Sequence, residues 1–350
     1  MSPLPPDIET FDPVRAAPAD LAALHAFTSG MRTELLPDDP ATPLEEAITV
    51  WRLNEQSARI STWLARAGAD RSVVARGQVF FARTGGNLHL ASGSVEVLPA
   101  WRRRGIARVL LARIAAVMRE EERPLLIAST MAHAPGGAAL LERLGAERGL
   151  EATVRQLRLS TLDRSRLDAW LAREGGEAFE LGFWDGPYPE TELEAIAGLH
   201  EVMGTQPTGT IAIKPEPVTG EQLRKVEAAM AARDRKRWTA FARERATGRF
   251  AGFTELSWLP RAPELLHQGN TGVYPEFCGH GLGARLKAAM LVRVLHERPE
   301  ARFVRTSNAD VNAAMLRINQ VLGFEPYSHQ TVWQARLEAI ETWLGGETAS

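Results

Sequence analysis

The sequence is poor in cysteine, and it has neither an excess of one charge nor a long apolar run. Its 350 residues contain a single cysteine, Cys278, which excludes an intramolecular disulfide and is compatible with a reducing compartment. The formal net charge is −2, from 41 basic and 43 acidic residues. No overall electrostatic field therefore favours nucleic acid or an anionic membrane as a partner.

Two further classes of protein are disfavoured by what the sequence lacks. No apolar run reaches membrane-spanning length, and the first residues lack the charged and apolar regions of a secretion signal, so we expect a cytoplasmic protein that does not bind a membrane. The eight histidines and the single cysteine form no cluster with the spacing of metal ligands. We therefore expect no metal site.

A short glycine-rich turn occurs twice, each time between a strand-like and a helical segment. The copies are residues 102–107 (RRRGIA) and 278–283 (CGHGLG). Such a junction points several backbone N–H groups and the positive end of the helix dipole at one place, which favours binding of a phosphate or pyrophosphate. Neither turn continues as Gly-Lys-Ser/Thr, which disfavours nucleotide hydrolysis by a P-loop. After each turn, apolar residues follow one helical face: Ile106, Leu110, Ile114 and Val117, then Leu282, Leu286, Met290 and Val294.

The same order of elements follows both turns. Gly105 and Gly281 are 176 residues apart, and each is followed by a helix, an apolar strand and a second helix that ends in Leu-Gly. The Leu-Gly pairs are 178 residues apart, and at that offset residues 153–159 (TVRQLRL) and 331–337 (TVWQARL) share five of seven positions. So long a repeat predicts two whole domains. We place the boundary within residues 160–176, which gives domains of residues 1–165 and 166–350.

The remaining pattern predicts a mixed α/β fold, with a mixed sheet flanked by helices in each half. We expect the proline-rich residues 1–15 to form a loose arm. In the first half we predict helices over residues 17–36 and 44–60 and strands over 72–83 and 88–98. In the second half we predict strands over residues 179–184, 238–243, 250–258 and 265–273 and helices over 190–203 and 219–233.

This order, in which a V-x-V strand leads into an R-x-x-G-x-A turn, a helix, a strand and a helix ending in Leu-Gly, resembles the GCN5-related N-acetyltransferase (GNAT) superfamily. The resemblance covers nearly the whole chain as two tandem copies. The second copy is similar to actinobacterial tandem acetyltransferases over residues 271–280, 281–287 and 306–315. The resemblance implies two tandem GNAT-like acyl-CoA N-acyltransferase domains.

The resemblance also implies the ligand of the turns, namely acetyl-CoA or another acyl-CoA, whose pyrophosphate the turn holds while the preceding strand pairs with the pantetheine arm. Cys278 stands where the family usually has Arg or Gln, which we expect to weaken CoA binding without abolishing it, because backbone amides hold most of the phosphate. The implied binding residues are Val97, Arg102, Arg103, Arg104, Gly105, Ile106 and Ala107 in the first copy, and Val273, Cys278, Gly279, His280, Gly281, Leu282, Gly283, Ala284, Asn308 and Asn312 in the second.

Direct attack of an amine on a thioester needs a base, an oxyanion donor and a leaving thiolate. In relatives a glutamate often stands six residues before the second valine of the strand motif. Here those valines are Val97 and Val273, and the residues six positions before them are Ala91 and His267. Alanine cannot act as a base, whereas His267 has a suitable intrinsic pKa. Glu255, on the preceding strand, is the other candidate, and both stay open.

The family's usual general acid is a tyrosine three residues before the Leu-Gly pair, and counting back gives Leu141 and Asn319. Neither donates a proton as a phenol does. A CoA thiol has a pKa of about 8.5, so its thiolate can leave without full protonation. Asn319 could then hold a water molecule or the CoA sulfur, with Tyr274 and Tyr327 as alternative donors.

We therefore expect an acetyl-CoA-dependent N-acetyltransferase that acts on the amine of a small molecule by direct attack in a ternary complex. We assign the chemistry to the C-terminal copy and CoA binding or a scaffolding role to the N-terminal copy. Two alternatives stay open, namely transfer to a peptide or protein amine and a non-catalytic acyl-CoA-binding module. The expected partners do not include nucleic acid or a membrane, and we expect a monomer or a homodimer.

Overall fold

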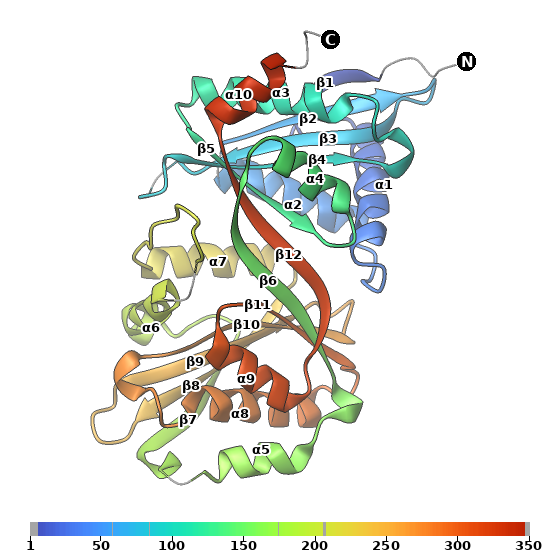
Figure 1. The fold of residues 1–350 in the computed structure, drawn as a ribbon. Helices are drawn as coiled ribbons and strands as arrows, with labels where there is room; N and C mark the ends of the chain where they lie inside the picture. Colours follow the sequence, from blue (N-terminus) through green and yellow to red (C-terminus); the bar gives the residue numbers. More distant parts are fainter. Residues whose placement is uncertain (1–5, 58, 84, 174, 206–207, 347–350) are drawn as a thin grey trace. The chain divides into compact units, whose positions relative to one another are not determined.

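The computed structural model describes residues 6–57, 59–83, 85–173, 175–205 and 208–346. The chain forms two compact units (Figure 1). Unit 1 comprises Met1–Glu151, Gly209–Lys214 and Gln330–Ser350, and unit 2 comprises Ala152–Thr208 and Pro215–His329.

Unit 1 is built on a mixed sheet with the strand order β1-β2-β3-β4-β5-β12. Neighbouring strands are antiparallel except β4 and β5, which are parallel. The strands are β1 (Asp7–Phe11), β2 (Arg59–Ala67), β3 (Ser72–Phe81), β4 (Leu90–Val97), β5 (Leu125–Met131) and β12 (Glu325–Arg336).

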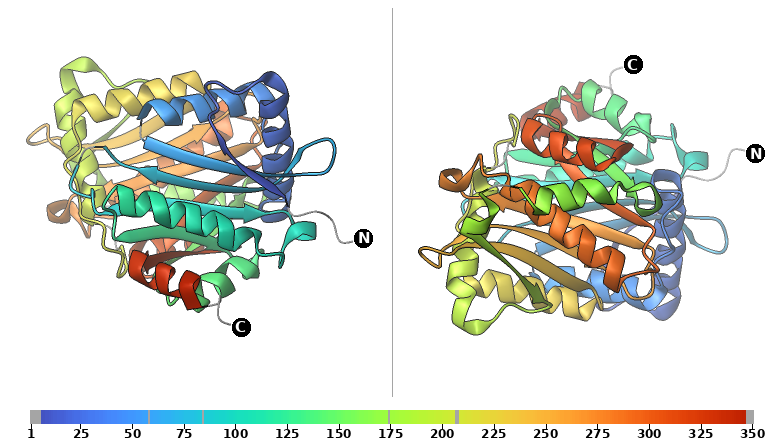
Figure 2. Two further views of the ribbon diagram at one scale, coloured as in Figure 1. Left: turned by 90° about the horizontal axis from the view of Figure 1, so that it is seen from above. Right: turned by 90° about the horizontal axis from the view of Figure 1, so that it is seen from below.

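Helices cover both faces of the unit 1 sheet because β2 and β3 bury side chains on both faces. On one face, Leu64 and Val73 pack with α1, whose Leu24 and Phe27 are also buried. On the other face, Trp63 packs with α3 and α10, and Figure 2 shows α3 lying along the strands. The helices are α1 (Pro18–Leu35), α2 (Leu44–Ser57), α3 (Ile106–Glu120), α4 (Pro135–Arg143) and α10 (Leu337–Gly346).

Unit 2 repeats this arrangement with the strand order β7-β8-β9-β10-β11-β6, again antiparallel except for the parallel pair β10 and β11. Helices α6 and α7 lie on one face of the sheet, and α8 and α5 on the other (Figure 1). The strands are β6 (Glu147–Arg158), β7 (Phe179–Asp185), β8 (Lys236–Glu244), β9 (Phe250–Trp258), β10 (Leu265–Val273) and β11 (Phe303–Ala309). The helices are α5 (Arg164–Leu171), α6 (Leu193–His200), α7 (Gly220–Ala232), α8 (Leu282–Glu297) and α9 (Ala313–Leu322). The predicted mixed α/β fold is thus confirmed in both units.

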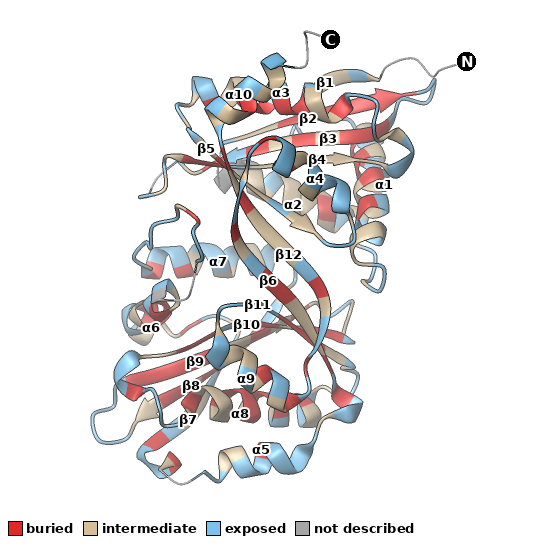
Figure 3. Cartoon of the chain, in the orientation of Figure 1, coloured by how far each residue is buried: buried red, intermediate tan, exposed pale blue. Residues whose placement is uncertain are grey.

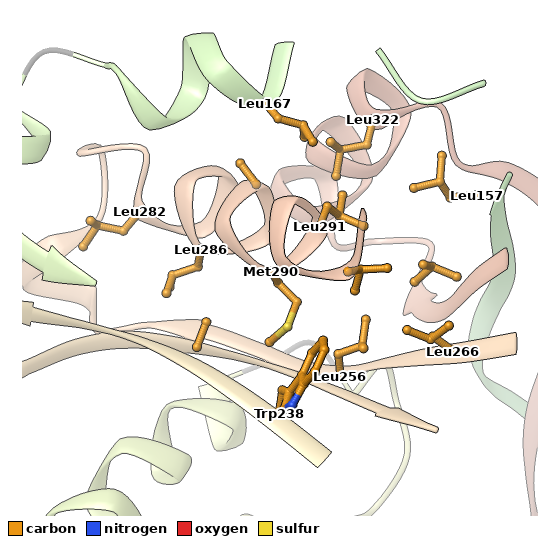
Figure 4. Close-up of a cluster of buried hydrophobic side chains, with 14 of the residues drawn as sticks. Leu157, Leu167, Trp238, Leu256, Leu266, Leu282, Leu286, Met290, Leu291 and Leu322 are labelled. Carbon is orange, nitrogen blue, oxygen red and sulfur yellow. The ribbon is translucent and has the colours of Figure 1, made fainter. Parts of the chain in front are cut away.

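The apolar face predicted for residues 282–294 forms the centre of the unit 2 core. Leu282, Leu286 and Met290 of α8 pack toward Trp238 of β8 and Leu256 of β9 (Figure 4). Burial is concentrated in the central strands and in α8, whereas α7 keeps a largely exposed outer face (Figure 3). Because α8 begins at the second turn, this packing fixes the turn on the sheet.

The last strand of each unit comes from the other half of the sequence. Residues 152–158 of β6 pair with β11 in unit 2, and residues 330–336 of β12 pair with β5 in unit 1. These strands contain the two similar segments at residues 153–159 and 331–337. The compact units therefore differ from the contiguous domains, residues 1–165 and 166–350, that the repeat predicts.

The loose arm predicted over residues 1–15 is wrong for Asp7–Phe11, which form the edge strand β1. This strand pairs with β2, and Glu9 on it accepts hydrogen bonds from Arg66 and Arg71. The flanking prolines dominated the local signal, and the strand is fixed by partners more than fifty residues away. The predicted helix over residues 44–60 ends at Ser57, and β2 begins at Arg59.

Candidate active site

The two glycine-rich turns have the same backbone conformation. Each follows a 3₁₀ turn, Pro99–Trp101 or Pro275–Phe277, and the next residue is extended in both copies. Arg103 and Gly105 have φ of 62° and 77°, and the equivalent Gly279 and Gly281 have φ of 86° and 73°. Glycine is favoured here because these angles lie in the left-handed region.

Both turns present backbone amides where a diphosphate could bind. Arg285 N is the first amide of α8 that reaches a carbonyl one turn back, at Gly281, so the N–H groups of Leu282, Gly283 and Ala284 precede the helical ladder. At the first turn a Cβ on Gly105 would meet no atom within 4 Å, so the space beside that backbone is open. Amides at the start of a helix fit an anionic phosphate group.

The side chains of the first turn are engaged within unit 1. The Arg102 guanidinium donates to both carboxylate oxygens of Glu34, at 2.8 and 2.5 Å, and to the Val97 carbonyl at 3.0 Å. Arg104 donates to the Ala100 carbonyl. Arg102 therefore links the turn to α1 and is not oriented toward the open space beside Gly105 by these contacts.

A different arginine stands at the second turn. The Cys278 thiol is exposed and donates to the Tyr274 carbonyl, and His280 Nδ1 lies 3.2 Å from the Phe277 carbonyl. A Cβ on Gly281 would come within 2.5 Å of Arg173 Nη1, so this guanidinium lies against the turn glycine. Arg173, just after α5, thus supplies the positive charge that Cys278 does not.

In each unit the two parallel strands separate beside the turn. The parallel pairing of β10 with β11 covers Leu265–His267 and Phe303–Arg305, although both strands continue. The pairing of β4 with β5 likewise covers Leu90–Ser92 and Leu125–Ile127. Beyond these residues the facing backbone groups of the two strands are left for another partner. This is the place where an extended ligand arm can pair with a strand.

A β-bulge distinguishes unit 2 from unit 1 at this place. The register of β10 against β9 shifts between Gln268 and Thr271, whereas the register of β4 against β3 is constant from Ser92 to Val97. A Cβ on Gly269 would lie 3.4 Å from the Cβ of Glu255. The bulge thus brings the irregular backbone of β10 against Glu255, and bulges commonly re-aim groups next to active sites.

Glu255 is held by hydrogen bonds through one carboxylate oxygen. Its Oε1 accepts from the Tyr188 hydroxyl at 3.0 Å and from Arg237 at 3.5 Å, and Arg237 also donates to Glu227 at 3.0 Å. Within the described part of the chain, Oε2 has no hydrogen-bond partner. The side chain is 13% exposed, so one oxygen is fixed while the other is available to accept a proton.

The contacts of the Tyr188 hydroxyl define the protonation of its neighbours. Because the hydroxyl donates its one proton to Glu255, it can only accept from His200 Nε2 at 3.1 Å and from Thr239 Oγ1 at 3.2 Å. Burial lowers the pKa of His200, which favours the neutral ring with its proton on Nε2. Burial, and then the Glu255 charge, raise the pKa of Tyr188. The phenol is therefore a fixed neutral donor at neutral pH.

The residues at the family's usual base position, and Glu96 on β4, lie away from the bulge or are engaged. His267 pairs across β10 and β9 with Ser257, so it shares a sheet face with Glu255 but stands before the bulge. Ala91 is fully buried in the unit 1 core. Glu96, the central residue of the first V-x-V motif, is ion-paired with Arg76 at 2.6 Å. Of the two carboxylates Glu96 and Glu255, only Glu255 lies next to a bulge in the neighbouring strand.

Asn319 is completely buried and faces α8. Its Oδ1 accepts from Lys287 Nζ at 2.7 Å, and its Nδ2 donates to Asn308 Oδ1 at 2.6 Å. Asn312 caps α9 by accepting from the Met315 amide at 3.2 Å. Of the residues implied by the resemblance, Asn308 therefore lies on the separated part of β11, while Asn312 has a structural role in α9.

The two alternative phenols also have defined surroundings. The Arg305 guanidinium lies over the ring of Tyr327, with its Cζ 3.9 Å from the ring centroid. Tyr274 follows β10 directly, and burial raises the pKa of its hydroxyl. Tyr274 therefore lies next to the second turn and Tyr327 lies on β12, and both stay alternative donors.

Sequence reasoning missed Tyr188, His200, Arg237 and Arg173. Tyr188 lies between two prolines in a connection, His200 ends a short helix, and Arg237 is the second residue of a strand. No spacing links these residues, and the fold alone brings them to Glu255. For Arg173 there was an indirect signal. The second turn has Cys278 at the usual arginine position, so a positive charge from a neighbouring element could be expected there.

The family model for the GNAT acetyltransferases matches residues 27–146. A solved structure described as a tandem GNAT protein from the clavulanic acid biosynthesis pathway is 26% identical, with a TM-score of 0.75, over 95% of this chain and 99% of that one. A GCN5-related N-acetyltransferase from Sphaerobacter thermophilus, 16% identical, has a TM-score of 0.67 over 94% and 96% of the two chains. No curated protein sequence matches the chain.

The matched region ends at the end of the first strand–turn–helix repeat, and the full-length structural match extends over both repeats. No helix of the described residues is long and apolar enough to cross a bilayer. The matched family model, the second copy of the same turn and the tandem neighbour support one conclusion. Residues 27–146 match the GNAT acetyltransferase family, and the chain as a whole has the fold of a tandem GNAT acyltransferase.

Proposed function

We propose that this chain transfers an acetyl or other acyl group from acyl-CoA to the amine of a small molecule, by direct attack within unit 2. The observation that carries the proposal is the position of Glu255. It lies on β9 against the bulge of β10, next to the point where β10 and β11 separate. A diphosphate anchor, an open strand edge and a carboxylate thus follow one another along one sheet.

The acyl-CoA substrate would be held by groups of this chain. The amides of Leu282, Gly283 and Ala284 suit its diphosphate, with the Arg173 guanidinium adding a charge-assisted contact. The free edge of β10 near Val273 suits the amides of the pantetheine arm. Backbone N–H groups at the bulge suit the thioester carbonyl, whose oxygen becomes negative during attack.

The acceptor amine must lose a proton to become an N-acyl product. Oε2 of Glu255 is the proposed proton acceptor, directly or through one water molecule. Tyr188 and Arg237 hold the other oxygen, so the carboxylate keeps one orientation. The amine nitrogen bonds to the thioester carbon, the C–S bond pair moves to sulfur, and the amine proton moves to the carboxylate. His267 stays a second candidate because it shares this face of the sheet.

Gly281→Glu tests the assignment of the turn. A glutamate side chain would bring a negative charge to the diphosphate position and would collide with Arg173, so we expect calorimetry to show no CoA binding in unit 2. Gly248→Glu is the matched control, because Gly248 also has a left-handed φ, of 73°, and a Cβ there would meet no atom within 4 Å. Unchanged CoA affinity in Gly281→Glu would refute the site.

Gly105→Glu tests the assignment of the chemistry to unit 2. We expect it to remove any CoA binding at the first turn and to leave thiol release from acetyl-CoA unchanged, with a panel of amino sugars and amino acids as acceptors. If this variant stays folded and loses all turnover, the chemistry belongs to unit 1. Thiol release by the wild-type chain that depends on an added amine would reject a non-catalytic binding module.

A further inference from the structure

A buried chain of hydrogen bonds runs from α8 to β11 in unit 2, and the proposed function does not use it. Lys287 Nζ donates to Asn319 Oδ1 at 2.7 Å, and Asn319 Nδ2 donates to Asn308 Oδ1 at 2.6 Å. The first two residues are 1% and 0% exposed, and Asn308 is half-buried. These hydrogen bonds therefore lead from the interior of unit 2 to the part of β11 that has separated from β10.

The direction of this chain is set by its buried end. The Lys287 amine donates to Asn319, which presents its oxygen to it. The nitrogen of Asn319 then faces Asn308, which must present its own oxygen in turn. The Nδ2 group of Asn308 remains as a donor, and among the described residues it has no hydrogen-bond partner. A lysine thus fixes which atom of Asn308 is free.

Asn308 lies where a leaving thiol would need such a donor. It stands on β11 three residues after Arg305, the last residue in register with β10, and therefore on the part of the strand that has separated. In the transfer reaction, negative charge develops on the sulfur as the C–S bond breaks. A fixed N–H donor aimed at a developing charge lowers the barrier more than it strengthens substrate binding.

We propose that Asn308 donates from Nδ2 to the sulfur of acyl-CoA as the thiolate leaves, and that Lys287 and Asn319 are positioning residues that orient Asn308. This inference rests on the proposed function and adds a specific donor to it. The electron pair of the broken C–S bond stays on sulfur, and the proton of the amine goes to Glu255. The thiolate needs no proton in this step.

The test measures kcat and KM for acetyl-CoA with an accepted amine, and checks folding by circular dichroism and thermal unfolding. We expect Asn308→Ala to lower kcat by about 10- to 100-fold and to change KM less than about threefold. Lys287→Met should lower kcat in the same way. The double variant should be no slower than Asn308→Ala, because both changes remove the same contact.

Asn319→Asp separates orientation from packing. A carboxylate there still accepts from Lys287, but it offers no donor to Asn308, whose amide must turn its nitrogen inward. We expect a loss of kcat close to that of Asn308→Ala in a protein that remains folded. If Lys287 were only structural, its effect would multiply with that of Asn308→Ala, and this result would overturn the inference.

Failure of this inference can be told apart from failure of the proposed function. A wild-type chain that releases no thiol with any amine overturns both. Turnover that Gly281→Glu abolishes and that Asn308→Ala leaves unchanged overturns only the assignment of Asn308. Turnover that both variants reduce, with CoA binding retained in Asn308→Ala, supports the assignment.

Discussion

Glu255→Gln removes the proposed base while changing the shape of the side chain very little. General-base catalysis typically contributes a factor of about 10² to 10⁴, which corresponds to about 3 to 5 kcal/mol of activation free energy. We therefore expect kcat to fall by about that factor. KM for acyl-CoA should stay near the wild-type value, because the diphosphate is held at the turn and not at Glu255.

The structure also bounds the effect on stability. A glutamine oxygen can still accept from Tyr188, and Arg237 keeps its shorter contact, 3.0 Å, to Glu227. The main change is that a hydrogen bond to a charged acceptor becomes one to a neutral acceptor, which is worth about 1 kcal/mol. The variant should therefore fold and unfold nearly as the wild-type protein does.

The assay is spectrophotometric thiol release from acetyl-CoA, recorded as kcat/KM against pH. A base acts only when deprotonated, so the wild-type rate should rise with pH through the pKa of the base and then level off. This acidic limb should vanish in Glu255→Gln. Glu192→Gln is the matched control, since it also removes a carboxylate from an arginine pair, that with Arg243. A variant at position 255 that retains the wild-type acidic limb would exclude Glu255 as the base and favour His267.

Three further outcomes follow from the same contacts. Tyr188→Phe should lower the free energy of unfolding in urea by about 1 to 3 kcal/mol, because two buried donors lose their acceptor, and an unchanged value would contradict the assigned contacts. Burial lowers the pKa of Lys287 to about 7 from an ordinary value of 10.5. Between these pH values the unfolded chain therefore binds more protons than the folded chain. The free energy of unfolding of the wild type, relative to that of Lys287→Met, should rise there by up to about 1.4 kcal/mol per pH unit. A difference between the two proteins that does not change with pH would contradict the lowered pKa of Lys287. Arg173→Ala should weaken CoA binding about tenfold in calorimetry, whereas Arg166→Ala, on the exposed surface of α5 before Arg173, should have no effect; equal affinities of Arg173→Ala and the wild-type chain would show that Arg173 does not contact the ligand.

The turns and the elements beside them could be predicted because their causes are local. Positive φ at Gly105 and Gly281 favours glycine, and the helices that follow bury one face at helical spacing. For the same reason α1, predicted over residues 17–36, extends from Pro18 to Leu35. An element whose signal lies within its own residues can be located from one sequence.

The candidate site was only partly predictable because its causes are not local. Glu255 is on a strand with clear alternation and could be named from the sequence. Its partners cannot be named in this way, since Tyr188 is 67 residues away and contacts it only once β7, β8 and β9 have paired. The strand β1 illustrates the same limit, because Glu9 finds Arg66 only in the folded sheet.

The exchange of the last strands shows how two similar segments can be assigned to different sheets. Residues 153–159 and 331–337 share the same pattern, so pattern alone does not say which segment pairs with β5 and which with β11. Their differences do fit the observed partners. Trp333 is 1% exposed in the unit 1 core and donates from Nε1 to Thr130 of β5, whereas Leu157 is fully buried in the unit 2 core. Volume and one hydrogen bond thus separate the two pairings, because a core packed to constant density accepts only the side chain that fills it.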